Sequence, residues 1–163
     1  MIKNISNLGD AALYCDFGKE VNKDINSQVI RYFKSIQKEN ITGVNNLTPS
    51  YNKLIVSFDL RKTNFKDLKK LIENLEINNS DDLKSKKIEI PVCCDENFSL
   101  DIKRLEEKLK ASKEKLFDNF FNKEFFCYMT GFIAGMPFLG DLDENMRVKR
   151  LETPRVKVPK GSI

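Results

Sequence analysis

The chain has 163 residues, of which 40% are hydrophobic and 32% are charged, and its 28 basic and 24 acidic side chains give a net charge of +4. This composition is typical of a globular protein with one large domain or two small ones. The charges are interspersed, and no run is apolar enough to cross a bilayer or to form a signal peptide, so we expect a cytoplasmic protein that binds neither nucleic acid nor membrane.

The first half of the chain predicts alternating strands and helices. Period-2 and period-3.6 patterns predict a strand at 12–17, a helix at 22–38, strands at 41–47 and 54–58, a helix at 65–75 capped by Thr63 or Asn64, a polar turn at 78–82 and a strand at 88–92. This β-α-β-β-α-β order matches the ferredoxin-like fold, in which both helices cover one face of an antiparallel sheet.

The pattern changes after residue 94. A charged amphipathic helix is predicted at 99–110, a short apolar helix at 116–121 and a strand from Phe125. Seven of the twelve phenylalanines lie between Phe117 and Phe138. Such a cluster forms a small domain's core or, alternatively, an exposed groove for a partner. We therefore predict an α+β protein with two domains, residues 1–94 and 95–163.

The titratable residues exclude several kinds of site. The chain has no histidine, which excludes Ser-His-Asp and Cys-His catalysis within it. The four cysteines (Cys15, Cys93, Cys94 and Cys127) lack Cys-x-x-Cys spacing, and we interpret them as reduced, mostly buried thiols. The adjacent Cys93 and Cys94 leave a redox role open as an alternative. No metal ligands are predicted, and the catalytic residues stay unknown.

A loop rich in glycine and apolar residues spans 131–140. Its glycines permit positive φ, while Phe132, Met136 and Phe138 supply an apolar lining. Backbone amides in such a turn can bind an anion. The spacing fits neither the Walker A motif nor the dinucleotide fingerprint, so ATP binding does not follow from it. The alternative is a tight turn between strands.

The segment 147–163 is basic, with six positive residues and one negative residue. Arg150 and Arg155 can form bidentate forks with a carboxylate or phosphate, which makes them candidate anion ligands or interface anchors. Two prolines and the alternation at 156–158 predict an extended strand or an edge. The alternative is a solvated basic tail.

Two motifs carry a resemblance to a known family. They read Gly131-Phe132-x-x-Gly135-x-Pro137-Phe138-Leu139 and Arg150-x-x-Thr153-Pro154-Arg155-x-x-Val158-Pro159-x-Gly161-Ser162-Ile163. The chain resembles the family of 5-oxoprolinase B-type subunits, which also includes a sporulation-kinase inhibitor and proteins labelled allophanate hydrolase subunit 1. Agreement extends over nearly the whole chain, at Gly9 to Leu13, Phe17-Gly18, Asn26 with Val29, Gly43-Val44, Leu54 to Asp59, Ile90 to Val92, and Asp101.

The resemblance implies a ferredoxin-like domain at 1–94 and a cyclophilin-like β-barrel domain at 95–163. Family members continue past the Gly-Ser segment with further barrel strands and a Pro-Gly-Gly-Trp element, so we expect the barrel to be truncated. Phe120 stands where the family tends to carry a histidine, and Ala134 and Met136 replace the usual proline and phenylalanine.

The resemblance also implies a function. We expect a subunit of a bacterial ATP-dependent 5-oxoprolinase, which converts 5-oxoproline, ATP and water to glutamate, ADP and phosphate and is not self-sufficient. The implied partners are A-type and C-type subunits, and the assembled complex uses ATP with Mg²⁺. The anion- or partner-binding residues are Gly131, Phe132, Gly135, Arg150, Pro154, Arg155, Gly161 and Ser162. An allophanate hydrolase-type subunit, an inhibitor that binds a histidine kinase and an inactive truncated copy are the alternatives.

Overall fold

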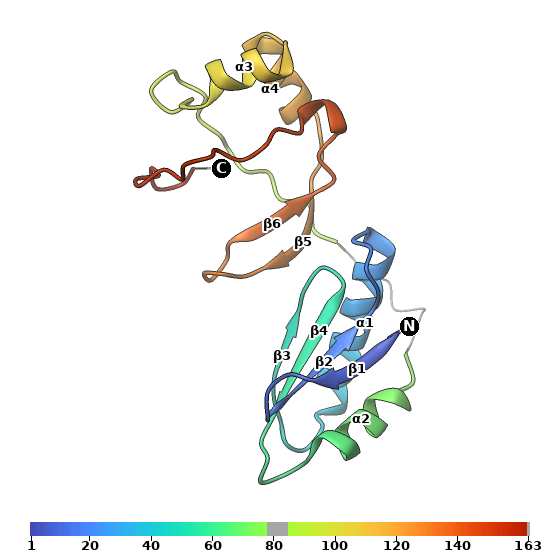
Figure 1. Cartoon of the computed structure of the whole chain (residues 1–163). Coiled ribbons are helices and arrows are strands. Elements are labelled where there is room, and N and C mark those ends of the chain that lie inside the picture. The colour runs from blue at the N-terminus through green and yellow to red at the C-terminus, as the bar shows by residue number, and fades with distance from the viewer. Residues whose placement is uncertain (78–84, 163) are drawn as a thin grey trace. The chain divides into compact units, whose positions relative to one another are not determined.

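A computed structural model of the chain describes residues 1–77 and 85–162 (Figure 1). Its elements in chain order are β1 (Asn4–Asn7), β2 (Ala12–Asp16), α1 (Lys23–Glu39), β3 (Val44–Pro49), β4 (Lys53–Phe58), α2 (Phe65–Glu73), α3 (Ile102–Leu109), α4 (Lys113–Phe121), β5 (Phe126–Thr130), β6 (Pro137–Gly140) and the 3₁₀-helix η1 (Glu144–Met146). They form two compact units, residues 1–88 with 126–140 and residues 89–125 with 141–163. The polar turn predicted at 78–82 lies outside the described residues.

The first unit is built on a four-stranded antiparallel sheet with strand order β1-β2-β4-β3. Leu13 pairs with Val56 and Cys15 with Leu54 across the two central strands. Side chains alternate between the faces of a strand, so these four residues share one face, and all four are fully buried. This face therefore carries the core.

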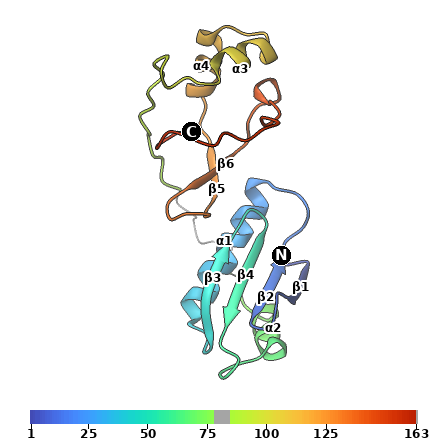
Figure 2. The same cartoon turned by 60° about the vertical axis from the view of Figure 1, so that its left-hand side comes forward.

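Two amphipathic helices cover that face (Figure 1, Figure 2). The Asn22 side chain caps α1 by accepting a 2.9 Å hydrogen bond from the backbone N–H of Ile25. Asn64 caps α2 in the same way through Asp67. The buried apolar positions are Val29 and Ile36 on α1 and Leu68 and Ile72 on α2. The prediction of both helices is confirmed, and Asn64 is the cap of the second.

The strand predicted at 88–92 is wrong. These residues are irregular and exposed, and Pro91 has no N–H to give to a ladder. The outer position beside β2 is instead occupied by β1, which places Ile5 opposite Cys15. β1 was not predicted from the sequence, because its single apolar side chain, Ile5, gives no alternating pattern. The observed fold is a mixed α/β protein with antiparallel sheets and, among residues 1–77 and 85–162, four α-helices.

The hairpin of β5 and β6 belongs to the first compact unit, although the sequence analysis placed it in a domain spanning 95–163. Phe126 pairs with Gly140, and the register shifts by a bulge between Cys127 and Met129. The domain division at residue 94, and the ferredoxin-like and cyclophilin-like assignments, stay predictions.

The second unit contains α3, α4 and η1. The hydroxyl of Ser112 caps α4, and α3 ends at Lys110 in the left-handed conformation (φ 52°). The rings of Phe120 and Phe125 lie 5.0 Å apart and are half-buried, whereas Phe121 is exposed. Part of the phenylalanine cluster is thus local core and part is surface.

The basic segment after η1 has irregular backbone, so the strand predicted there is wrong. Among the residues described, no helix is both long and apolar enough to span a membrane.

Candidate functional site

Three backbone amides of the loop between β5 and β6 bond to carbonyls of the same loop. The N–H of Gly131 donates to the carbonyl of Met136 at 3.0 Å, that of Ile133 to Gly131 at 2.8 Å, and that of Met136 to Ile133 at 3.2 Å. Gly135 has φ +80° with open space around it. Three of the loop's amides thus have carbonyl partners within the loop.

The tip of this loop exposes apolar side chains. Phe132 is 90% exposed and has a φ of +66°, a conformation that is unfavourable for a bulky residue. Ile133 and Met136 are also exposed. We call Phe132, Ile133 and Met136 the hairpin tip. Strain at an exposed aromatic side chain that gains little packing within the chain is typical of an interface anchor.

The base of the hairpin is fixed by a buried amide. Asn26 on α1 is 3% exposed, and its Nδ2 donates to the carbonyl oxygens of Ser50, Tyr51 and Tyr128 at 3.1, 3.0 and 3.0 Å. An amide has two N–H groups, so one of them is shared between two acceptors. The rings of Tyr51 and Tyr128 lie 5.8 Å apart and add aromatic packing. The hairpin tip is therefore presented from a rigid base.

A second cluster lies in the unit that contains α3. The guanidinium of Arg155 donates from Nη1 and Nη2 to the two carboxylate oxygens of Asp101, both at 2.7 Å. Arg104 donates from Nε to the same carboxylate at 3.3 Å and from Nη1 to the carbonyl of Lys149 at 3.3 Å. These bonds attach the basic segment to the start of α3.

The other predicted site residues of the basic segment are Arg150, Pro154, Gly161 and Ser162, and all four are exposed. Gly161 has φ +82°, and the hydroxyl of Ser162 donates to the carbonyl of Pro159 at 2.8 Å, which makes a tight turn. The structure thus brings Arg155 to Asp101, whereas the hairpin tip and the basic segment belong to different compact units. The role of all eight predicted site residues in binding stays a prediction.

Sequence reasoning did not single out Asp101 or Asn26 as site residues. Both were among the positions that match the family, and that match was the available signal.

Of the cysteines, Cys15 is buried, and burial raises the pKa of its thiol to about 12. Cys93 and Cys127 are exposed, so the expectation of mostly buried thiols is wrong. Within 1–77 and 85–162, no group of three or more Cys, Asp or Glu residues could hold a metal ion.

Asp101 makes the stability of the chain depend on pH. Hydrogen bonds from Arg155, and then the charges of both arginines, hold the pKa of Asp101 below its ordinary value of 3.8. A lowered folded-state pKa stabilises the fold above the unfolded-state pKa, and this contribution is lost as the pH falls through the folded-state pKa. We expect Asp101→Asn to lower the Tm slightly at pH 7 and by a smaller amount at pH 2. A difference in Tm that is equal at both pH values would contradict this assignment.

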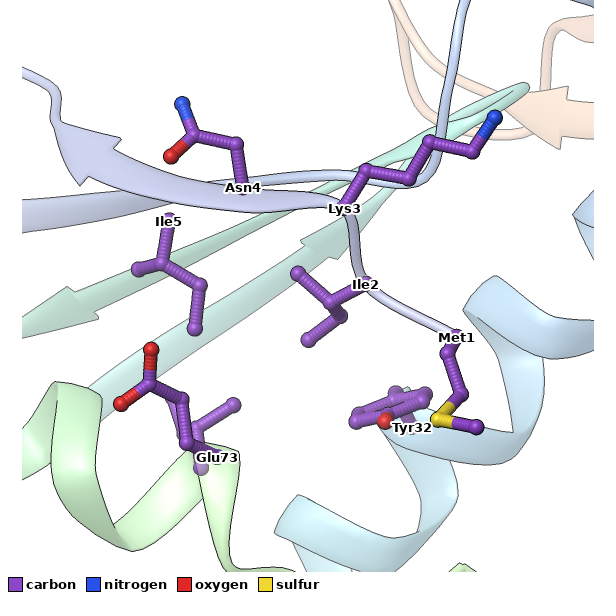
Figure 3. A pocket seen from close by; sticks show the side chains of 8 residues that line it. Met1, Ile2, Lys3, Asn4, Ile5, Tyr32 and Glu73 are labelled. Atoms are coloured by element: carbon purple, nitrogen blue, oxygen red, sulfur yellow. The ribbon is translucent and has the colours of Figure 1, made fainter.

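A small cavity lies beneath the N-terminal strand (Figure 3). It has a volume of about 140 Å³ and is lined by Met1, Ile2, Lys3, Asn4, Ile5, Tyr32, Ile72 and Glu73. In Figure 3 the ammonium of Lys3 points away from the Glu73 carboxylate. Ligand pockets usually have volumes of roughly 300–1,000 Å³. The cavity contains none of the predicted site residues, so it does not define the candidate site.

The chain is thus a mixed α/β protein with an exposed apolar hairpin. Its basic segment is held by the hydrogen bonds of Arg155 to Asp101 and of Arg104 to the carbonyl of Lys149. The family model for the carboxyltransferase domain, subdomain C and D, matches residues 3–163, and the chain belongs to this family. It is 29% identical to the B-type subunit of 5-oxoprolinase from Bacillus subtilis, over 98% of this chain and 71% of that protein. It is 28% identical to the protein of the same name from Haemophilus influenzae, over 98% and 74%. The resemblance found in the sequence is confirmed.

Solved structures share the fold. A crystal structure of TTHA0988 matches 91% of this chain with a TM-score of 0.78 and 23% identity, and the urea amidolyase of K. lactis matches 78% with a TM-score of 0.52 and 12% identity. The chain spans 29% of the TTHA0988 chain and 9% of the amidolyase. Similarity at this level of identity establishes the fold alone.

Proposed function

We propose that this chain is a subunit of an ATP-dependent 5-oxoprolinase and that it acts only together with partner subunits. The observation that carries the proposal is the alignment of 98% of the chain with two proteins named as the B-type subunit of 5-oxoprolinase. The proposed partners are the A-type and C-type subunits.

The reaction explains why ATP is needed. A lactam carbonyl is poorly electrophilic, and phosphorylation of its oxygen by ATP makes the carbonyl carbon electrophilic. Attack by one water then breaks the ring C–N bond, whose nitrogen takes a proton, and a second water releases phosphate from the resulting acyl phosphate. Mg²⁺ and positively charged donors stabilise the phosphoryl charge. On this chain Arg155 is held by Asp101, and three of the loop amides bond to loop carbonyls, which makes these groups less available to a nucleotide. We therefore place ATP and Mg²⁺ in the assembled complex and not on this chain.

The hairpin tip supports a docking role. Phe132 is an exposed aromatic residue on a base that Asn26 holds rigidly. Interface hot spots are often aromatic residues of this kind, and a preformed loop loses little entropy on binding. The same surface favours a second candidate function, inhibition of a histidine kinase, because a kinase inhibitor also needs an exposed apolar surface.

Replacing Phe132 tests the docking role. We expect Phe132→Ser to weaken association with the A-type and C-type subunits of the same genome by about 2 kcal/mol, roughly 30-fold, without lowering the Tm. Leu60→Ser is the matched control, because Leu60 is an exposed apolar residue (58%) outside the hairpin. The docking role is wrong if both variants bind like the wild-type chain.

Activity tests the function itself. Phosphate and glutamate released from ATP and 5-oxoproline are measured for the chain alone, for the A-type and C-type subunits alone, and for the mixture. We expect turnover only in the mixture. Equal turnover without this chain would refute the oxoprolinase role, and inhibition of a sensor kinase's autophosphorylation by the chain would favour the second candidate.

A further inference from the structure

We infer that Asp101 is the positioning residue of a cationic docking surface that fits an acidic face on a partner protein. The surface consists of residues 147–160, and Arg150, Lys157 and Lys160 make the contact. The identity of the partner as an oxoprolinase subunit rests on the proposed function, whereas the construction of the surface rests on the observed bonds.

The first step is the geometry at Asp101. Its carboxylate accepts two parallel 2.7 Å bonds from Arg155, a residue 54 positions later in the chain. A bidentate pair fixes direction as well as distance. Arg104 adds a second attachment point through the carbonyl of Lys149. The backbone of this segment has no ladder or helix of its own, so these side-chain bonds set its course.

The second step is the distribution of charge. The segment contains six basic residues and one acidic residue. Asp101 neutralises Arg155, and Arg147 donates its Nε to the carbonyl of Leu142 at 3.2 Å. Arg150, Lys157 and Lys160 are exposed. Positive charge on these three side chains is complementary to a negatively charged face.

The third step distinguishes the kind of partner. Val148, Val156 and Val158 are exposed at 36%, 106% and 62% and alternate with the cations. A surface that reads a phosphate backbone needs cations but gains nothing from exposed valines. Mixed apolar and cationic side chains are typical of protein interfaces, where arginine is enriched. The segment therefore fits an acidic protein face that also has apolar contacts.

This assignment changes the role predicted for Arg155. Arg155 was predicted as an anion ligand or interface anchor, but its fork is occupied by Asp101 within the same unit. Arg155 is then part of the support for the surface. In this inference Arg150 is the arginine that meets the partner.

Charge reversal tests the contact residues. We expect the double variant Arg150→Glu, Lys157→Glu to bind the A-type and C-type subunits at least roughly tenfold more weakly, with an unchanged Tm and a weaker dependence on salt. The matched control is Lys34→Glu, Lys66→Glu, which changes the net charge equally at exposed positions of α1 and α2. Equal loss in both double variants would overturn the inference, because overall charge would then explain binding.

Asp101→Asn tests positioning. This change makes the chain more positive, so simple electrostatic attraction to an acidic partner predicts tighter binding. Positioning predicts weaker binding, because the segment loses its attachment. The exchange variant Asp101→Arg, Arg155→Asp restores an ion pair, and we expect it to bind more tightly than Asp101→Arg alone. Tighter binding by Asp101→Asn, or no recovery in the exchange variant, would contradict the role of Asp101.

Two measurements keep this test separate from the proposed function. Trypsin should cleave the isolated chain after Arg150 several-fold faster in Asp101→Asn than in the wild type, whatever the partner is, and equal rates overturn the inference.

Binding to a duplex DNA probe is the second measurement. If the Arg150→Glu, Lys157→Glu variant loses affinity for DNA and not for the subunits, the surface serves nucleic acid. If the wild-type chain fails to activate the subunits, the proposed function is contradicted. The trypsin result still tests the role of Asp101, because it does not depend on the subunits.

Discussion

Replacing Asn26 with aspartate is expected to destabilise the first compact unit by about 3–5 kcal/mol. The amide of Asn26 donates to three carbonyl oxygens in an environment where the side chain is 3% exposed. A carboxylate has no N–H to donate, so a buried negative charge would face three carbonyl oxygens. Since total stabilities of small domains are roughly 5–15 kcal/mol, the loss is a large part of the total.

The pH dependence identifies this mechanism. Burial raises the folded-state pKa of a carboxyl group, so protonation would relieve the Asn26→Asp variant. We expect this variant, measured by thermal unfolding, to recover part of its lost stability as the pH falls toward about 4. Asn45→Asp is the control, because Asn45 is exposed. A loss below about 1 kcal/mol, or no recovery in acid, would mean that the three hydrogen bonds of Asn26 contribute little to the stability of this unit.

Replacing Gly140 with alanine is expected to cost about 1–3 kcal/mol. A Cβ atom at Gly140 would lie 2.5 Å from Cε2 of Tyr128. Tyr128 is 4% exposed, and its ring packs at 4.8 Å from Phe126 and 5.8 Å from Tyr51. The ring therefore has little room to move, and the strain falls on the hairpin.

Gly131→Ala in the same hairpin provides the control for this steric argument. A Cβ atom there would meet the end of the flexible Met129 side chain at 3.0 Å, and φ is not in the positive range. Alanine also reduces the entropy of the unfolded chain, so the change should be close to neutral. Denaturant unfolding of both variants gives the comparison. Similar losses at the two positions would contradict the steric explanation.

The helices and central strands of the first unit could be predicted because local sequence and packing agree. On α1, the residues Val29 and Ile36 fall on one face, and Asn22 supplies the cap. On β4 the buried residues Leu54, Val56 and Phe58 alternate with partly exposed ones, which is the period of a strand. Each of these elements carries its own signal within about ten to twenty residues.

The failed strand predictions have a common physical origin. Ile88 and Ile90 alternate like a strand, but strand formation needs a partner edge, and β1 already occupies the edge of β2. Pairing between distant segments is decided by tertiary competition, which a local pattern does not record. The short β1 has no alternating pattern of its own, and its pairing with β2 defines it.

The kinds of residue in the candidate site could be predicted from the sequence, but the contacts between them could not. The exposed Phe132 and the basic segment stood out in the sequence, and the structure shows both on the surface. The pairing of Arg155 with Asp101 links residues 54 positions apart, and the acceptors of Asn26 include a carbonyl 102 positions away. Neither pairing follows from spacing.

The most direct test of the proposed function is a titration of this chain into fixed amounts of the A-type and C-type subunits. Glutamate and phosphate release from 5-oxoproline and ATP is followed as the chain is added, with Asn26→Asp as the destabilised control. We predict that activity rises from background and saturates at a fixed molar ratio, and that the Phe132→Ser and Arg150→Glu, Lys157→Glu variants need higher concentrations to reach the same plateau. Activity that is already maximal without the chain, or that stays at background at every ratio, would contradict its role in an oxoprolinase.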